Sequence, residues 1–242
     1  MRDVQTELAA YRAAVAELAP RVRLGRGELA IRVVEGRGAW WERLKDAAAY
    51  VIDEPDPAPA DVHERLALLT APVVVMRRRL RPDVVADAGD AFESPQHVVV
   101  DAWGGRTDAV ALLRDAAGWA RVLAGGPVRV VARADAEVAT TVAVRTEGGV
   151  GASIARVIGG GVGSVLTATA LGSRRVEARV DSASPLCEVA FDDDDGRRIA
   201  PVRRESPERL ALRRVVEAVK RGEALTDLEE LSADDAVVLH PS

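Results

Sequence analysis

The hydrophobic pattern of this chain changes once along its length, and that change limits the fold more than any other feature. Up to about residue 80, short β-branched runs alternate with stretches of helical period. Strands that alternate with helices imply right-handed crossovers and a parallel sheet. The predicted strands are 28–35, 48–52 and 72–76, with helices at 39–46 and 60–70.

The amino terminus is predicted to be helical. Residues 3–19 place Val4, Leu8, Tyr11, Val15 and Leu18 at spacings of three and four. This is the period of a helix with one buried face, and Pro20 would end it.

From about residue 98 the pattern becomes that of an antiparallel sheet. A strand at 98–100 and a helix at about 107–123 lead into a series of valine- and threonine-rich runs separated by Gly-Gly, Gly-Ser and Ala-Ser-Pro breaks. These runs are 128–134, 138–146, 151–158, 164–170, 175–180 and 187–191. A last helix, Pro207–Arg221, is introduced by Ser206 and followed by Gly222.

The predicted fold class is therefore α/β plus α+β. A truncated Rossmann-like half at residues 1–82 precedes a large, mostly antiparallel sheet with flanking helices at residues 83–242. The acidic run Asp192–Asp195, followed by Gly196, predicts a hairpin turn. No metal site is expected, because consecutive acids alone do not define a coordination geometry.

Composition excludes several function classes. A net charge of −5 supplies no basic field for nucleic acid or for an anionic membrane, and no apolar run approaches the length of a membrane span. The amino terminus lacks a signal-peptide core and the single Cys187 excludes an intrachain disulfide, so we expect a cytoplasmic protein. Only Lys45 and Lys220 are lysines, which leaves few amines for proton transfer.

Two segments carry a family pattern. Residues 47–79 read AAAYVIDEPDPAPADVHERLALLTAPVVVMRRR, and residues 101–108 read DAWGGRTD. They resemble the D-A-V-x-I-x-T-P, H, V-x-V-E-K-P and D-x-G-x-H-x-x-D stretches of the Gfo/Idh/MocA oxidoreductases. The resemblance implies a Rossmann domain with a large sheet, an NAD(P) cofactor and a sugar-like substrate.

The catalytic positions of that family depart from the pattern. Arg77, in Met76-Arg77-Arg78, stands where the family has its lysine, and Gly105 stands where it has its histidine, while Asp108 is retained. An arginine stays protonated and cannot act as an acid/base at neutral pH. His63 matches the family histidine after the proline, a structural or cofactor-adjacent position.

The glycine loop of the family is also absent from the start of the chain. The one candidate for G-x-G-x-x-G is Gly25-Arg-Gly27-Glu-Leu-Ala30, but the residues after it predict a strand rather than the required helix. We expect an ordinary turn there. Glu35 either stands for the ribose-binding acid at the end of the second strand or is an exposed strand-end glutamate.

Three functions follow from these observations. The favoured one is a non-catalytic binding or assembly subunit without a cofactor, paired with itself or with an intact paralogue. The second is a reduced NAD(P)-dependent oxidoreductase that uses Asp101 or Asp108 as acid/base. The third is a sensor or carrier whose Arg77, Arg78 and Arg79 hold a small anion, with Asp101 as a further ligand candidate.

A homodimer through the large sheet is expected. Helices can cover only one face of the sheet, and a large apolar area on the other would mark an interface, most simply a two-fold one. The resemblance implies the same contact. Both faces of the strands are expected to carry apolar or β-branched side chains, supplied by residues such as Val142, Val144, Ile154, Val165, Thr167 and Val176. The alternative is an outer face dotted with threonines and with Arg145, Arg156, Arg175 and Arg179.

Overall fold

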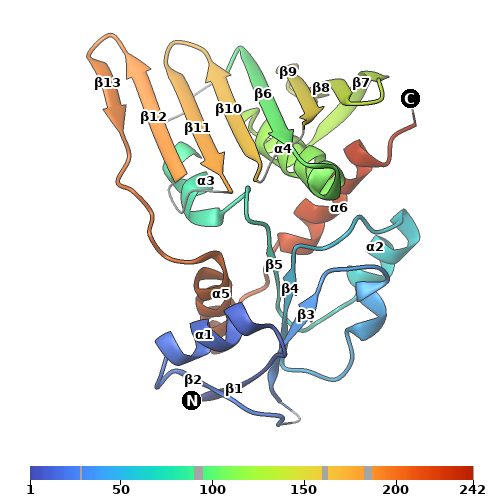
Figure 1. Cartoon of the computed structure of the whole chain (residues 1–242), viewed down its shortest axis with the longest axis vertical. Helices are drawn as coiled ribbons and strands as arrows, with labels where there is room; N and C mark the ends of the chain where they lie inside the picture. The colour runs from blue at the N-terminus through green and yellow to red at the C-terminus, as the bar shows by residue number, and fades with distance from the viewer. Residues whose placement is uncertain (28, 90–94, 160–162, 183–186, 242) are drawn as a thin grey trace. The chain divides into compact units, whose positions relative to one another are not determined.

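The computed structural model describes residues 1–27, 29–89, 95–159, 163–182 and 187–241 (Figure 1). The chain groups into two compact units, one of Met1–Arg78 with Glu205–Ser232 and one of Arg79–Arg204 with Ala233–Ser242. Residues 205–232 thus return to the first unit after the chain has passed through the second.

The first unit contains a five-stranded parallel sheet. Its order is β2-β1-β3-β4-β5, and every pairing is parallel. After β1 the chain adds β2 at one edge of the sheet. It then returns to the other side of β1, where β3, β4 and β5 follow in order to the opposite edge. The strand order therefore reverses between β1 and β3. This is the Rossmann-like arrangement that the alternating pattern predicted. The strands are β1 (Arg2–Gln5), β2 (Val22–Leu24), β3 (Ile31–Glu35), β4 (Ala49–Asp53) and β5 (Val73–Met76).

The prediction of a helix over residues 3–19 is wrong at its start. The chain opens with strand β1, and helix α1 covers only Ala9–Glu17. Val4 is fully buried and pairs with Leu24 on one side and Ile31 on the other. Sheet pairing with residues distant in sequence thus overrides the local helical period.

Helices cover both faces of this sheet. Alternate strand residues face opposite ways, so Val51 and Val74 pack with residues of α1 and α5 (Pro207–Arg221). Ile52 and Val75 pack with residues of α2 (Ala60–Leu66) and α6 (Asp227–Val238). The predicted helix at 39–46 is a short 3-10 helix, η1, at Trp40–Arg43.

The outer edge of β5 is closed by a side chain. Asp227 accepts a hydrogen bond from the Val75 amide at 2.9 Å and forms a two-pronged pair with the Arg214 guanidinium at 2.8 and 2.9 Å. A charged group therefore takes the place of a sixth strand at an edge that would otherwise expose a free amide.

The second unit contains an eight-stranded sheet of order β13-β12-β11-β10-β6-β9-β8-β7. All its pairings are antiparallel except β6 with β9, which confirms the mostly antiparallel prediction. The chain turns between β12 and β13 at Asp194 and Asp195, so the acidic run is a hairpin turn as predicted. The strands are β6 (His97–Gly104), β7 (Val128–Asp135), β8 (Ala139–Thr146), β9 (Gly151–Ile158), β10 (Val165–Leu171), β11 (Arg175–Asp181), β12 (Cys187–Asp193) and β13 (Gly196–Ile199).

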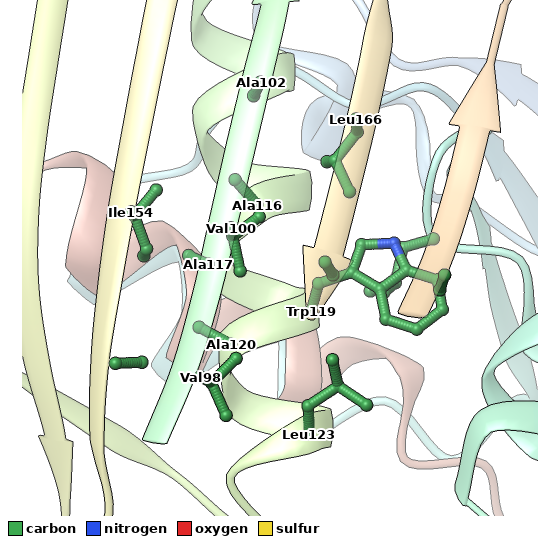
Figure 2. Close-up of a cluster of buried hydrophobic side chains, with 14 of the residues drawn as sticks. Val98, Val100, Ala102, Ala116, Ala117, Trp119, Ala120, Leu123, Ile154 and Leu166 are labelled. Carbon is green, nitrogen blue, oxygen red and sulfur yellow. The ribbon is translucent and has the colours of Figure 1, made fainter. Parts of the chain in front are cut away.

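Helix α4 (Ala109–Leu123) covers one face of this sheet (Figure 2). Ala116, Ala117 and Ala120 face the valines of β6, and Trp119 lies fully buried toward β10. Small side chains let the helix approach the strands closely. A second helix, α3 (Pro82–Gly89), contacts β11 and β12.

The residues expected to give both faces of the sheet apolar or β-branched side chains divide between the two faces. Val142, Val144, Ile154 and Val176 are buried in the core on the covered face. Val165 and Thr167 are half-buried on the other face. Arg156, expected on the outer face, also points to the covered face, where it donates to the Ala109 carbonyl at 3.2 Å. Among the described helices, none is long and apolar enough to cross a membrane.

Candidate functional site

In a doubly wound sheet, ligands bind at the carboxyl ends of the strands where the strand order reverses. In the first unit this place lies between β1 and β3. The segments that follow the strands there are Thr6–Leu8 after β1, Gly36–Gly38 after β3, Glu54–Asp56 after β4 and Arg77–Arg78 after β5.

The turn from β1 to α1 contains no glycine. Thr6 Oγ1 accepts a hydrogen bond from the Leu8 amide at 3.1 Å, and Leu8 precedes the first turn of α1. The exposed Glu7 carries a negative charge at the same place and pairs with Arg26 at 3.3 Å. A pyrophosphate needs close backbone approach, which glycine permits, and the negative charge of Glu7 opposes it at the start of α1.

The sequence candidates Gly25 and Gly27 follow the edge strand β2. A side chain at Gly25 would meet Asp3, because a Cβ there would lie 2.7 Å from Asp3 Cγ. The chain continues into strand β3 rather than into a helix. These glycines therefore make room for Asp3, which pairs with Arg23 at 2.6 Å. Glu28 of the same motif lies outside the described residues.

A second glycine turn, Gly36-Arg37-Gly38, ends strand β3 and was missed in the sequence. A Cβ at Gly36 would lie 2.2 Å from Pro55 Cα, so only glycine fits against the segment after β4. Gly38 has a left-handed φ of 58°. The signal was a pair of glycines directly after a β-branched strand.

The hydrogen-bond donors of the Gly36–Gly38 turn are paired with a carboxylate of the same chain. The Gly38 amide donates to Asp56 Oδ2 at 2.8 Å, and Arg37 Nη1 lies 3.3 Å from Asp56 Oδ1. The carbonyls of Glu35 and Arg37 accept hydrogen bonds from Arg43. Glu35 thus closes the turn through its backbone, and its side chain is exposed.

A partly buried set of hydrogen bonds lies at the ends of β4 and β5. The Tyr11 hydroxyl donates to Asp53 Oδ1 at 3.0 Å. Burial raises the pKa of Asp53 above its ordinary value, although Tyr11 and Arg78 oppose the shift, and burial and Asp53 raise the pKa of Tyr11. Glu54, which has a positive φ of 48°, accepts a hydrogen bond from the Arg78 amide.

The arginines after β5 pair with carboxylates of their own units. Arg78 lies 3.0 Å from the buried Glu208 of α5. In the second unit, Arg79 Nε lies 3.1 Å from the buried Asp115, and Arg79 Nη1 donates to Ser164 Oγ at 3.1 Å. Internal charges therefore neutralise Arg78 and Arg79, which does not favour an anion carrier built on them. Arg77 is buried as well.

Of the remaining sequence candidates, His63 belongs to the first unit, and Gly105, Asp108 and Asp101 belong to the second. His63 is buried on α2. Gly105 precedes the short 3-10 helix η2 (Arg106–Asp108), and Asp108 Oδ2 lies 4.0 Å from Arg79. Asp101 is exposed on the face of β6 opposite to the buried Val100 and Ala102, so it does not join Asp108. The described residues contain no group of three or more metal-ligating side chains.

Comparison with known proteins identifies the fold. No family model matches the sequence, and no curated protein matches it. UDP-N-acetylglucosamine 3-dehydrogenase GnnA from Acidithiobacillus ferrooxidans is similar in structure, with a TM-score of 0.70 and 12% identity over 98% of this chain and 95% of that chain. A mutant of KijD10, a 3-ketoreductase from Actinomadura kijaniata in complex with TDP-benzene and NADP, gives 0.68 and 15% over 98% and 95%. The dehydrogenase MviM from Clostridium difficile gives 0.67 and 8% over 98% and 96%.

The chain has the fold of Gfo/Idh/MocA-type sugar dehydrogenases. That fold implies an NAD(P) cofactor, and the residues at the point of strand reversal do not fit one. The turn after β1 lacks glycine and carries Glu7, and the turn after β3 binds an internal carboxylate and leads to a four-residue 3-10 helix.

Proposed function

We propose that this protein is a degenerate member of the Gfo/Idh/MocA family that acts in the cytoplasm as a non-catalytic binding or assembly subunit. Its partner is a second copy of itself or an intact paralogue. The observation that carries the proposal is that neither strand beside the strand reversal ends in an open glycine turn that leads into an α-helix.

The acid/base positions support the same conclusion. Hydride transfer to or from a sugar carbon requires a group that gives up or takes a proton near neutral pH. Arg77 keeps its proton, and Gly105 has no side chain. Binding and assembly need neither group.

The surface for assembly is the face of the large sheet away from α4. Val165, Trp103 and Val157 lie side by side in register across β10, β6 and β9. Trp103 is 41% exposed and Val157 is 42% exposed. Next to them the face bears the small or β-branched residues Ala155 and Thr167. Asp101 lies between Ala155 and Thr167 on this face, so the apolar part of the surface is the row Val165, Trp103 and Val157. An exposed apolar row of this kind fits a second sheet.

The charged half of the same sheet limits the contact. Arg197 of β13 lies within 4 Å of three carboxylates, at 3.8 Å from Glu177, 3.4 Å from Glu188 and 3.6 Å from Asp192. These groups are paired within the chain and solvated, so their burial would cost free energy. The proposed contact therefore covers β8, β9, β6 and β10.

A titration with NADH and NADPH, followed by the fluorescence of Trp40 and Trp41, tests the non-catalytic role. We expect no saturable change, whereas an intact dehydrogenase of the same fold serves as the positive control. Submillimolar affinity would contradict the proposal. It would support the alternative, a reduced NAD(P)-dependent oxidoreductase acting on a sugar-like substrate, which the likeness to an NADP-bound ketoreductase favours.

A further inference from the structure

The turn after β3 combines two features of an anion-binding site. The Gly38 amide and the Arg37 guanidinium point at the same carboxylate group of Asp56. A backbone amide held by a left-handed glycine, together with an arginine, is a donor set that suits phosphate oxygens. The turn also stands at the carboxyl end of a parallel strand next to the strand reversal, where phosphate groups bind in doubly wound sheets.

Asp56 is held in this turn by its backbone as well as by its side chain. Its amide donates to the Gly36 carbonyl at 2.5 Å, and its carbonyl accepts from Trp40 Nε1 at 2.9 Å. The Gly36 amide in turn donates to the Asp53 carbonyl at 2.8 Å. The carboxylate is therefore presented to the donors by main-chain contacts that do not depend on it.

We infer that the Gly36–Gly38 turn is a binding site for a phosphate or pyrophosphate group, and that the protein fills this site with its own Asp56 carboxylate. An internal ligand that is fixed by the backbone has a high effective concentration, so an external anion competes poorly. The carboxylate also repels an approaching phosphate, because both are negative.

This inference is separate from the proposed function. The proposed function concerns nucleotide binding and hydride transfer by the natural chain. The self-filled turn concerns inorganic anion binding after one side chain is removed, so either can fail while the other stands.

The test is the affinity for inorganic pyrophosphate, measured by calorimetry at constant ionic strength. In Asp56→Ala the backbone contacts of residue 56 remain, and only the carboxylate is lost. We expect this variant to bind pyrophosphate at least about tenfold more tightly than the natural chain. Asp56→Asn keeps an oxygen for the Gly38 amide and removes the charge, so its affinity should lie between the two.

Two further variants make the result specific. Asp61→Ala removes the same charge from an exposed site on α2, where Asp61 lies 3.7 Å from Arg65, and it should not gain affinity. Arg37→Ala combined with Asp56→Ala should lose the gain, because one of the two donors is missing. A gain in Asp56→Ala no larger than in Asp61→Ala would overturn the inference.

The melting temperature distinguishes a binding site that is filled by Asp56 from a turn that Asp56 only caps. If Asp56 only caps the turn, Asp56→Ala lowers the melting temperature and added pyrophosphate does not restore it, which also overturns the inference. If the site is self-filled, pyrophosphate raises the melting temperature of Asp56→Ala and leaves that of Asp61→Ala unchanged.

Discussion

The hydroxyl of Tyr11 donates a hydrogen bond to the carboxylate of Asp53 at 3.0 Å, which links helix α1 to the end of strand β4. Tyr11 is 1% exposed, so the pair occupies space at the carboxyl end of the sheet with the protein's own side chains. Nearby, Arg78 and Glu208 add an ion pair between the end of β5 and helix α5. This edge is therefore stabilised by internal polar contacts.

The ionisation of Asp53 should make the first unit less stable as pH rises. Burial, the largest cause, raises the pKa of Asp53 in the folded state above its unfolded value. The stability that protonated Asp53 contributes is then present below the unfolded pKa and lost as pH rises through the raised folded-state pKa. In Asp53→Asn the amide oxygen still accepts from Tyr11 without a charge.

Urea unfolding of the natural chain and of Asp53→Asn, measured from acidic to neutral pH, tests this prediction. We expect Asp53→Asn to gain stability relative to the natural chain between acidic and neutral pH. Glu64→Gln, on the exposed face of α2, serves as the control and should show no such trend. A difference between Asp53→Asn and the natural chain that stays constant with pH would contradict this prediction.

Removal of Trp119 should strongly destabilise the second unit. Trp119 is fully buried in the core between α4 and the sheet (Figure 2). Its indole N–H donates to the Arg79 carbonyl at 2.6 Å. Trp119→Ala should lower the free energy of unfolding by about 3–5 kcal/mol. Thermal or urea unfolding measures it, and Ile199→Ala, at a 57% exposed position of β13 in the same sheet and outside the proposed contact, is the control. Equal losses in both variants would contradict the packing described.

Elements with strong local signals could be predicted from the sequence. Helix α5 has the predicted bounds, because Ser206 caps its first turn by accepting a hydrogen bond from the Arg209 amide and Gly222 follows its last residue. The sequence also predicted the strands of the large sheet other than β13, since valine and threonine recur in them between glycine breaks. Strand β13 (Gly196–Ile199) was not predicted.

Elements that depend on distant contacts could not be predicted. Helix α6 has buried acids, Asp234 and Asp235, where an apolar stripe would be expected, and they pair with Arg121 and Arg114 of α4. Strand β1 was predicted as part of a helix, because its apolar residues have helical spacing. The strands that pair with it come later in the chain, so the local sequence does not indicate them. The role of Asp56 could not be predicted either, since it depends on β4 lying next to β3.

Restoration of the two family residues should not restore activity. Arg77→Lys combined with Gly105→His would supply an amine and an imidazole that can exchange protons. We still expect no sugar-dependent production of NAD(P)H, because the turns at the strand reversal do not fit a dinucleotide. The assay follows absorbance of the reduced cofactor with a panel of sugars and nucleotide sugars, with circular dichroism to confirm folding. Measurable turnover would show that only the acid/base residues had been lost.

The last prediction concerns self-association through the open face of the large sheet. If Trp103 and Val157 lie at the centre of a two-fold contact, the natural chain should have a mass near twice the 25.7 kDa of one chain by light scattering at micromolar concentration. Val157→Asp places a carboxylate next to Trp103 at the centre of the contact, where it would be buried without a partner, so this variant should have the mass of one chain. Leu68→Asp places the same charge at an 80% exposed site of the first unit and should leave the dimer intact. A natural chain that is monomeric would reject self-association and direct the search to an intact paralogue as the partner of this face.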